Sequence, residues 1–215
     1  MTDAVAERDE HAGPPPRGLY ERLRADPLRA PELIALAASE RHAPAAADWV
    51  ERRRRVYGTD PAALAEMAKR RHASLARLEG AATGVGGVVT LVPDLVGLAW
   101  IQSRLVFYVA AAYGYDPHDR MRPAELLVLT GLYPDPQSAR AALDGVGTSV
   151  AQAYVGSRLG RDEALARRLL KMVGKRGGKR LAGRLVPFFA VAFNAVANER
   201  DTRALADRAI AFYGG

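Results

Sequence analysis

Residues 80–115 constrain the fold more than any other part of this 215-residue sequence, because they carry only two charged side chains, Asp94 and Arg104. The apolar residues between positions 93 and 113 fall around most of the circumference of a helix rather than along one stripe. A helix that is apolar on all sides has to be buried, either in protein or in lipid. The rest of the chain must therefore cover it, or a membrane must.

Two interpretations of this apolar sequence remain open. The longest uncharged runs are residues 80–93 and 185–198, with 14 residues each, whereas a helix that crosses a bilayer needs about 20. Neither run therefore predicts a membrane span. The stretch is either a core helix surrounded by other helices, or an element that dips into or lies on a bilayer. Gly80, Gly84 and Gly87 permit close helix packing in both cases, and we expect a bend or break near 84–87 because glycine is costly within a helix.

Helix start and stop signals recur along the chain, whereas strand signals do not. Proline is tolerated in the first helical turn and aspartate caps it, so we interpret Asp94, Asp116 and Asp135 as caps. The expected starts are Pro31, Asp60-Pro61, Pro93-Asp94, Pro123, Asp135-Pro136 and Asp162-Glu163, with a last helix from about Thr202 to Tyr213. We therefore predict an all-α fold: a single multi-helix domain of about seven to nine helices with a very apolar centre.

Arg104 needs a partner wherever its helix is buried. It lies about 15 Å along the helix axis from Asp94, which is too far for an ion pair within one helix. We expect Arg104 to pair with a residue from another part of the fold or to extend its charged end to solvent.

The chain divides into three parts by composition. Residues 1–18 lack apolar periodicity, and we expect a disordered, mobile tail. We expect residues 19–79 to form polar N-terminal helices and residues 80–215 to form an apolar helical core. Residues 19–215 together should form one domain. The N-terminus has no apolar segment of the secretory kind, and the sequence has no cysteine, which is usual in a reducing compartment. These features favour a cytoplasmic location.

The net charge of +7 is confined to one segment. Residues 161–184 contain nine basic and two acidic side chains, whereas residues 1–79 carry +1, residues 80–160 carry −1 and residues 185–215 are neutral. A protein that binds nucleic acid through a general positive surface would not show this distribution. Aromatic residues that stack on bases are also missing from this segment, which disfavours nucleic acid as a partner.

This basic block, residues 161–184, directly precedes the apolar segment 185–189. Several basic residues beside an apolar segment are typical of a protein that contacts anionic lipid, at about 1 kcal/mol per residue. A solvated basic face, balanced by acidic residues elsewhere in space, fits the sequence as well. The residues that we expect to contact lipid or another anion are Arg167, Arg168, Lys171, Lys175, Arg176, Lys179, Arg180 and Arg184, and apolar docking is assigned to Leu185, Phe188 and Phe189.

The sequence shows no catalytic constellation. The four histidines lie 30 or more residues apart and form no H-E-x-x-H or H-x-H pair. The glycine-rich stretches 84–87 and 174–179 lack the Gly-Lys-Ser/Thr ending or the preceding strand of a phosphate loop. We therefore expect no catalytic residue, no metal, no cofactor and no enzymatic activity.

Two parts of the chain resemble the EcsC family. The first combines the glycine-rich stretch 80–87, a Pro-Asp helix start and a Tyr-Gly-x-Asp helix stop; the second runs from a proline through an apolar segment to an asparagine and a closing helix. Together they cover roughly residues 70–213, although Ala190 and Asn194 stand where the family often has glycine. We assign to the structural motif Pro93, Asp94, Gln102, Arg104, Tyr113, Gly114, Asp116 and Asn198.

The resemblance implies a helical protein on the cytoplasmic side of a bacterial inner membrane, because the founding member is linked by name and gene context to an ABC transporter for protein secretion. It implies no established activity. We accordingly predict a non-enzymatic accessory or binding protein, peripheral to the membrane, whose partner is anionic lipid or a membrane transporter. The alternative is a soluble all-α module that binds a small apolar ligand or a partner helix in its core.

Overall fold

The computed structural model of the chain describes residues 13–58, 60–83, 91–147, 149 and 199–215. Over these residues it contains seven α-helices, one short 3₁₀ helix and no strand, which confirms the all-α prediction. Residues 1–12 of the predicted tail 1–18, and the predicted helix start at Asp162, lie outside the described residues. The end of the predicted tail differs from the structure, because α2 begins at Arg17 and the Gly13 carbonyl accepts a hydrogen bond of 3.0 Å from the Trp100 indole. The elements are α2 (Arg17–Ala25), η1 (Pro27–Arg29), α3 (Ala30–Tyr57), α4 (Pro61–Thr83), α5 (Leu91–Ala112), α6 (Arg122–Leu129), α7 (Pro136–Leu143) and α11 (Glu199–Gly214).

Most helices begin where the local sequence predicts, because capping depends on residues within one turn. The Asp135 carboxylate accepts a hydrogen bond of 2.8 Å from the Ser138 amide at the start of α7. The Asp60 carboxylate accepts one of 3.0 Å from the Ala62 amide at the start of α4. Each satisfies an amide that has no partner inside its own helix.

The predicted start of α5 is wrong by two residues. The helix begins at Leu91, so Asp94 is a residue of the helix and not its N-cap. Pro93 falls within the first turn, where the missing amide hydrogen costs no intrahelical hydrogen bond. The Pro-Asp pair therefore indicates a helix start correctly but places it too late.

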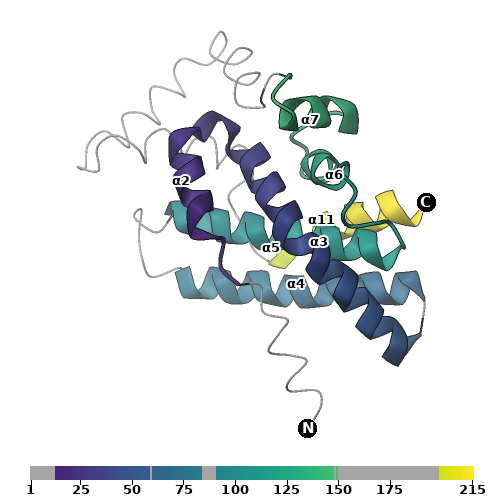
Figure 1. Cartoon of the computed structure of the whole chain (residues 1–215). Helices are drawn as coiled ribbons and strands as arrows, with labels where there is room; N and C mark the ends of the chain where they lie inside the picture. The colour runs from purple at the N-terminus through teal and green to yellow at the C-terminus, as the bar shows by residue number, and fades with distance from the viewer. Residues whose placement is uncertain (1–12, 59, 84–90, 148, 150–198) are drawn as a thin grey trace.

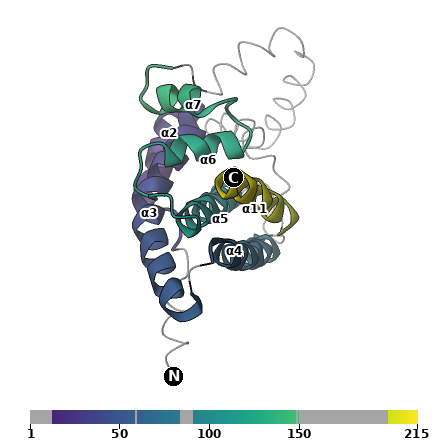
Figure 2. The same cartoon turned by 90° about the vertical axis from the view of Figure 1, so that its right-hand side faces the viewer.

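The helix α5 runs through the middle of the bundle. Every residue from 96 to 112 is buried. The helices α3 and α4 make the most extensive contacts with α5, and α11 also covers it. Figure 2 shows α5 between these three helices. This part of α5 is therefore a core helix covered by protein, whereas residues 84–90 and 185–198 lie outside the described residues.

The two short helices α6 and α7 form a second layer. They pack on each other, and α6 packs on α3 (Figure 1). In the part of the chain that the structure describes, no helix combines the length and the apolar character that a membrane crossing requires.

Arginines from distant parts of the chain bind the ends of three helices. The last carbonyl groups of a helix have no intrahelical partner and carry the negative end of the helix dipole. A guanidinium group donates hydrogen bonds to these carbonyl groups and is attracted by the negative end of the dipole. In each of the three cases the arginine belongs to a different element from the helix end that it binds. Arg29 donates to the Ala142 carbonyl of α7 (2.9 Å), Arg54 to the Ala112 carbonyl of α5 (3.4 Å), and Arg208 to the Leu129 carbonyl of α6 (3.0 Å).

Replacing Arg29 should destabilise the contact between α7 and the start of α3. Because Arg29 also donates to the Leu143 carbonyl at 3.4 Å, the Arg29→Ala variant should lose about 1–2 kcal/mol of unfolding free energy. Urea denaturation followed by circular dichroism measures this loss. The control is Arg24→Ala, which removes an exposed arginine from α2 and should change the unfolding free energy by less than about 0.5 kcal/mol. Equal losses in both variants would contradict the capping role.

Candidate functional site

The residues that the sequence assigns to the site fall into two groups. The eight basic residues from Arg167 to Arg184, the docking residues Leu185, Phe188 and Phe189, and Asn198 all lie outside the described residues. The other motif residues lie in α5 and in the turn that follows it. Within α5, Gln102 and Arg104 are both buried, with 7% and 3% of their surface exposed.

Arg104 finds its partner one turn further along its own helix. Its Nη2 atom donates a hydrogen bond of 2.9 Å to the Tyr108 hydroxyl, and its guanidinium carbon lies 4.9 Å from the centre of the same ring. The expectation of a partner in another element, or of an extension to solvent, was therefore wrong. Among the described residues no carboxylate pairs with Arg104. Since arginine stays protonated in proteins, α5 carries a buried positive charge.

Two buried histidines lie near Arg104. His42 of α3 packs against Trp100 with ring centres 4.4 Å apart, and His72 of α4 packs against Tyr108 with ring centres 5.1 Å apart. Burial, reinforced by the positive charge of Arg104, lowers the pKa of each histidine to about 3. Both rings are therefore neutral at physiological pH.

Four buried nitrogen atoms at this junction have no hydrogen-bond partner in the described structure: His42 Nε2, Trp49 Nε1, His72 Nε2 and Arg104 Nη1. Buried polar atoms are nearly always paired, so four of them at one junction are unusual. The Trp49 indole also packs against Tyr108, with ring centres 5.1 Å apart. We refer to these four residues and Tyr108 as the buried polar cluster.

The Tyr-Gly-x-Asp motif ends α5 and contacts the end of the chain. Gly114 has a φ of +87°, a conformation that favours glycine. A side chain at Gly214 would meet the Tyr113 ring at 3.1 Å, so the two segments pack tightly. The prediction that Asp116 caps a helix is wrong. Its carboxylate accepts a hydrogen bond of 2.9 Å from the His118 amide within a turn, and α6 begins only at Arg122.

A second buried cluster joins α6 to α11, and no pattern in the sequence indicated it. The Tyr213 hydroxyl donates a hydrogen bond of 2.6 Å to Glu125 Oε2, which also pairs with Arg122. The Arg122 guanidinium carbon lies 5.2 Å from the Tyr115 ring centre and 5.5 Å from that of Tyr213. Burial raises the pKa of Glu125 and that of Tyr213. The Arg122, Glu125 and Tyr213 side chains thus bind one another, although Arg122 Nε has no hydrogen-bond partner among the described residues. This is the arrangement of a structural contact.

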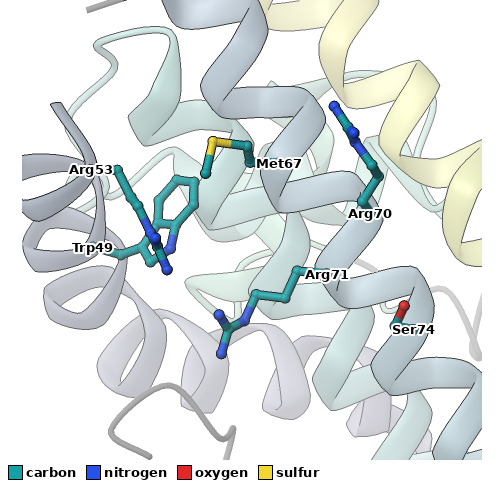
Figure 3. A pocket seen from close by; sticks show the side chains of 6 residues that line it. All are labelled: Trp49, Arg53, Met67, Arg70, Arg71 and Ser74. Carbon is teal, nitrogen blue, oxygen red and sulfur yellow. The ribbon is translucent and has the colours of Figure 1, made fainter. Parts of the chain in front are cut away.

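An open pocket of about 410 Å³ lies between α3 and α4 (Figure 3). Three of its six lining residues are arginines, and none of the six is acidic. The lining residues are Trp49 and Arg53 from α3 and Met67, Arg70, Arg71 and Ser74 from α4. Trp49 belongs to both the pocket and the buried polar cluster. We call this the α3–α4 pocket.

The α3–α4 pocket and the buried polar cluster contain groups that can attract anions and form hydrogen bonds. Guanidinium groups attract carboxylates and phosphates, and neutral buried histidines supply hydrogen bonds without adding charge. The described residues contain no group of three or more histidine, aspartate or glutamate side chains that could hold a metal ion.

The sequence analysis did not predict the buried polar cluster, because most of its members lie far apart in the chain. The spacing of four between Arg104 and Tyr108 does predict a contact on one helix face.

Acidification should destabilise the fold through His42 and His72. The unfolded chain takes up protons at both residues below about pH 6.5, whereas the folded protein does so only near pH 3. The stability that they contribute is therefore complete above pH 6.5 and falls as the pH decreases from there to about 3. Over this range each histidine should lower the unfolding free energy by about 1 kcal/mol per pH unit. Urea unfolding at pH 7, 6 and 5 measures this loss.

A matched pair of variants isolates this effect. In His72→Gln the loss of unfolding free energy between pH 7 and pH 5 should be smaller than in the wild type. His118 is exposed, so His118→Gln should keep the wild-type loss. An unchanged pH dependence in His72→Gln would refute the assignment to His72.

Comparison with known proteins supports the resemblance noted in the sequence. The profile of the EcsC protein family matches residues 55–214, about three quarters of the chain. The uncharacterized protein YdbA of Bacillus subtilis (strain 168) is 37% identical over 57 residues, which make up 26% of this chain and 21% of YdbA. The chain thus spans about a fifth of the length of this curated relative. No solved structure matches the chain.

The family profile covers α5, α6, α7 and α11 completely and α4 as well. It therefore includes three of the five members of the buried polar cluster (His72, Arg104 and Tyr108) and the contact between the Tyr-Gly-x-Asp motif and the end of the chain. On the extent of this match, the chain belongs to the EcsC protein family.

Proposed function

We propose that this EcsC-family chain is a non-enzymatic accessory or binding protein at the cytoplasmic face of a bacterial membrane. The basic block, residues 161–184, attracts anionic lipid, and Leu185, Phe188 and Phe189 dock in the apolar boundary of the bilayer. A membrane transporter is the protein partner that the family's gene context suggests.

The observation that carries this proposal is the confinement of the net charge of +7 to the basic block. Nine basic side chains precede an apolar segment with two phenylalanines, so electrostatic attraction and apolar docking act at the same place. The block also lies inside the region that the family profile matches. Each of the other parts of the chain is close to neutral when its charges are summed.

A second candidate is a soluble all-α module that binds a small apolar ligand or a partner helix. The observation that favours it is the burial of residues 96–112 of α5 among other helices. This candidate predicts no lipid affinity, and it predicts a ligand that co-purifies with the protein.

Flotation with liposomes tests the first candidate. The full chain should float with vesicles that contain anionic lipid and remain at the bottom with neutral vesicles, and binding should weaken as salt increases because salt screens the attraction. Reversing the charge at Arg168, Lys171, Lys175 and Lys179 should weaken binding at least about 100-fold, since each basic residue near the surface contributes about 1 kcal/mol.

The control reverses four exposed arginines elsewhere. The variant with Arg17, Arg22, Arg24 and Arg52 changed to glutamate has the same net charge as the block variant, and these four residues are exposed on α2 and α3. It should float like the wild type if the block makes the contact. Flotation that is equally reduced in both variants, or unaffected in the block variant, would refute the proposed contact.

A further inference from the structure

Three members of the buried polar cluster surround one tyrosine ring. The centres of the Trp49 and His72 rings each lie 5.1 Å from the centre of the Tyr108 ring, and the guanidinium carbon of Arg104 lies 4.9 Å from it. All four residues are almost completely buried. Trp49, His72 and Arg104 each carry a nitrogen atom that has no hydrogen-bond partner in the described structure. Three unsatisfied polar atoms are thus gathered around a single side chain.

The two histidines of the cluster present lone pairs rather than N–H groups. His72 Nδ1 lies 2.8 Å from the Ala68 carbonyl oxygen. This oxygen can only accept, so Nδ1 carries the proton of the neutral ring and Nε2 is an acceptor. The ring of His42 likewise donates to the backbone of Trp100, and its Nε2 atom is the one without a partner. The cluster therefore holds two acceptors that lack a donor.

The other two unpartnered atoms are donors. Arg104 Nη1 and Trp49 Nε1 carry hydrogen atoms and have no lone pair to offer. The printed partner of Arg104 is the Tyr108 hydroxyl, which occupies Nη2 and leaves Nη1 unpaired. Buried donors and acceptors are nearly always satisfied. Two of each at one junction require a group that both donates and accepts hydrogen bonds.

This balance of donors and acceptors disfavours an ion at the cluster. An anion would accept from Arg104 and Trp49, but it would face the lone pair of His72. A metal cation would bind that lone pair, but the guanidinium charge of Arg104 would repel it. A water molecule carries no charge and forms two to four hydrogen bonds, as donor and as acceptor, in protein interiors. Water therefore fits this set of atoms better than either ion.

We propose that the buried polar cluster is a binding site for ordered internal water, which accepts hydrogen bonds from Arg104 and Trp49 and donates to Nε2 of His72 and His42. The cluster members belong to α3, α4 and α5, so the bound water connects the three helices. A fully satisfied polar network fixes the relative placement of the elements that it joins. Trp49 also lines the open α3–α4 pocket (Figure 3), which gives the water a route of exchange with solvent. The site is independent of the basic block and of membrane binding.

A high-resolution crystal structure of the full wild-type chain tests the proposal. An isolated water oxygen should lie within about 3.2 Å of both Arg104 Nη1 and His72 Nε2. Its displacement parameter should be similar to those of the surrounding side chains. A direct hydrogen bond between Arg104 and His72, with no oxygen density between them, would overturn the proposal.

The same crystals separate water from the other occupants. After a soak in sodium bromide, anomalous density beside Arg104 would identify an anion and overturn the assignment to water. Density that continues from the oxygen into further atoms would identify a hydroxyl group of a larger ligand, and this result would also overturn it. Unchanged isolated oxygen density after the soak would support the proposal.

Oxygen-17 relaxation dispersion counts the long-lived internal water molecules of the protein in solution. His72→Phe keeps a ring of similar size but removes the acceptor, so this variant should lose at least one long-lived water. The control is Ser103→Ala in α5, because the buried Ser103 hydroxyl already donates to the Ala99 carbonyl. Ser103→Ala should retain the wild-type number.

Circular dichroism melting verifies that both variants are folded, and the wild-type crystal structure decides the question if His72→Phe is not. Equal numbers of long-lived water molecules in the wild type and in folded His72→Phe would contradict the proposed site. Flotation of the wild type with liposomes does not bear on this result, since the water site requires no membrane.

Discussion

Residues 96–112 of α5 are buried along their whole length, and the other described helices are arranged around them. A helix that is apolar on all sides requires cover on all sides, and α3, α4 and α11 supply it. The polar side chains of α5 must then be satisfied inside the core. Ser103 donates a hydrogen bond of 2.7 Å to the Ala99 carbonyl of the previous turn, and Arg104 uses Tyr108 of the next turn. Ser103 and Arg104 thus form hydrogen bonds within α5. Arg104 Nη1, near His42 and His72, has no hydrogen-bond partner in the described structure.

Arginine serves several purposes in this fold, and each depends on its chemistry. Arg29, Arg54 and Arg208 bind the carbonyl ends of distant helices, while Arg122 stacks on two tyrosine rings and pairs with Glu125. A guanidinium group keeps its charge when buried, donates in several directions and stacks on aromatic faces. Lysine does these things less well, because its ammonium group is more strongly hydrated. Only 4 of the 31 basic residues are lysines, which agrees with these roles.

The accuracy of the sequence predictions follows the range of the interactions involved. The Asp60 and Asp135 caps were correct because each bonds an amide two or three residues away. Asp116 shows the limit: the same Asp-Pro pattern closes a turn there instead of starting a helix. The 28-residue helix α3 continues through Pro44, although an internal proline usually ends or bends a helix. Packing on α5 and α6 stabilises α3 along its length.

Composition, periodicity and short motifs are enough to predict the helical class, the need to bury α5, the family and the position of the net charge, because none of these depends on contacts between distant residues. The tertiary structure is needed to show that His42, His72 and Arg104 meet, that Tyr113 packs on Gly214, and that Arg53 and Arg71 point toward each other beside Trp49 (Figure 3). These contacts join residues from helices far apart in the chain. They depend on how α3, α4, α5 and α11 pack together, and that packing is a property of the whole core, which no local pattern encodes.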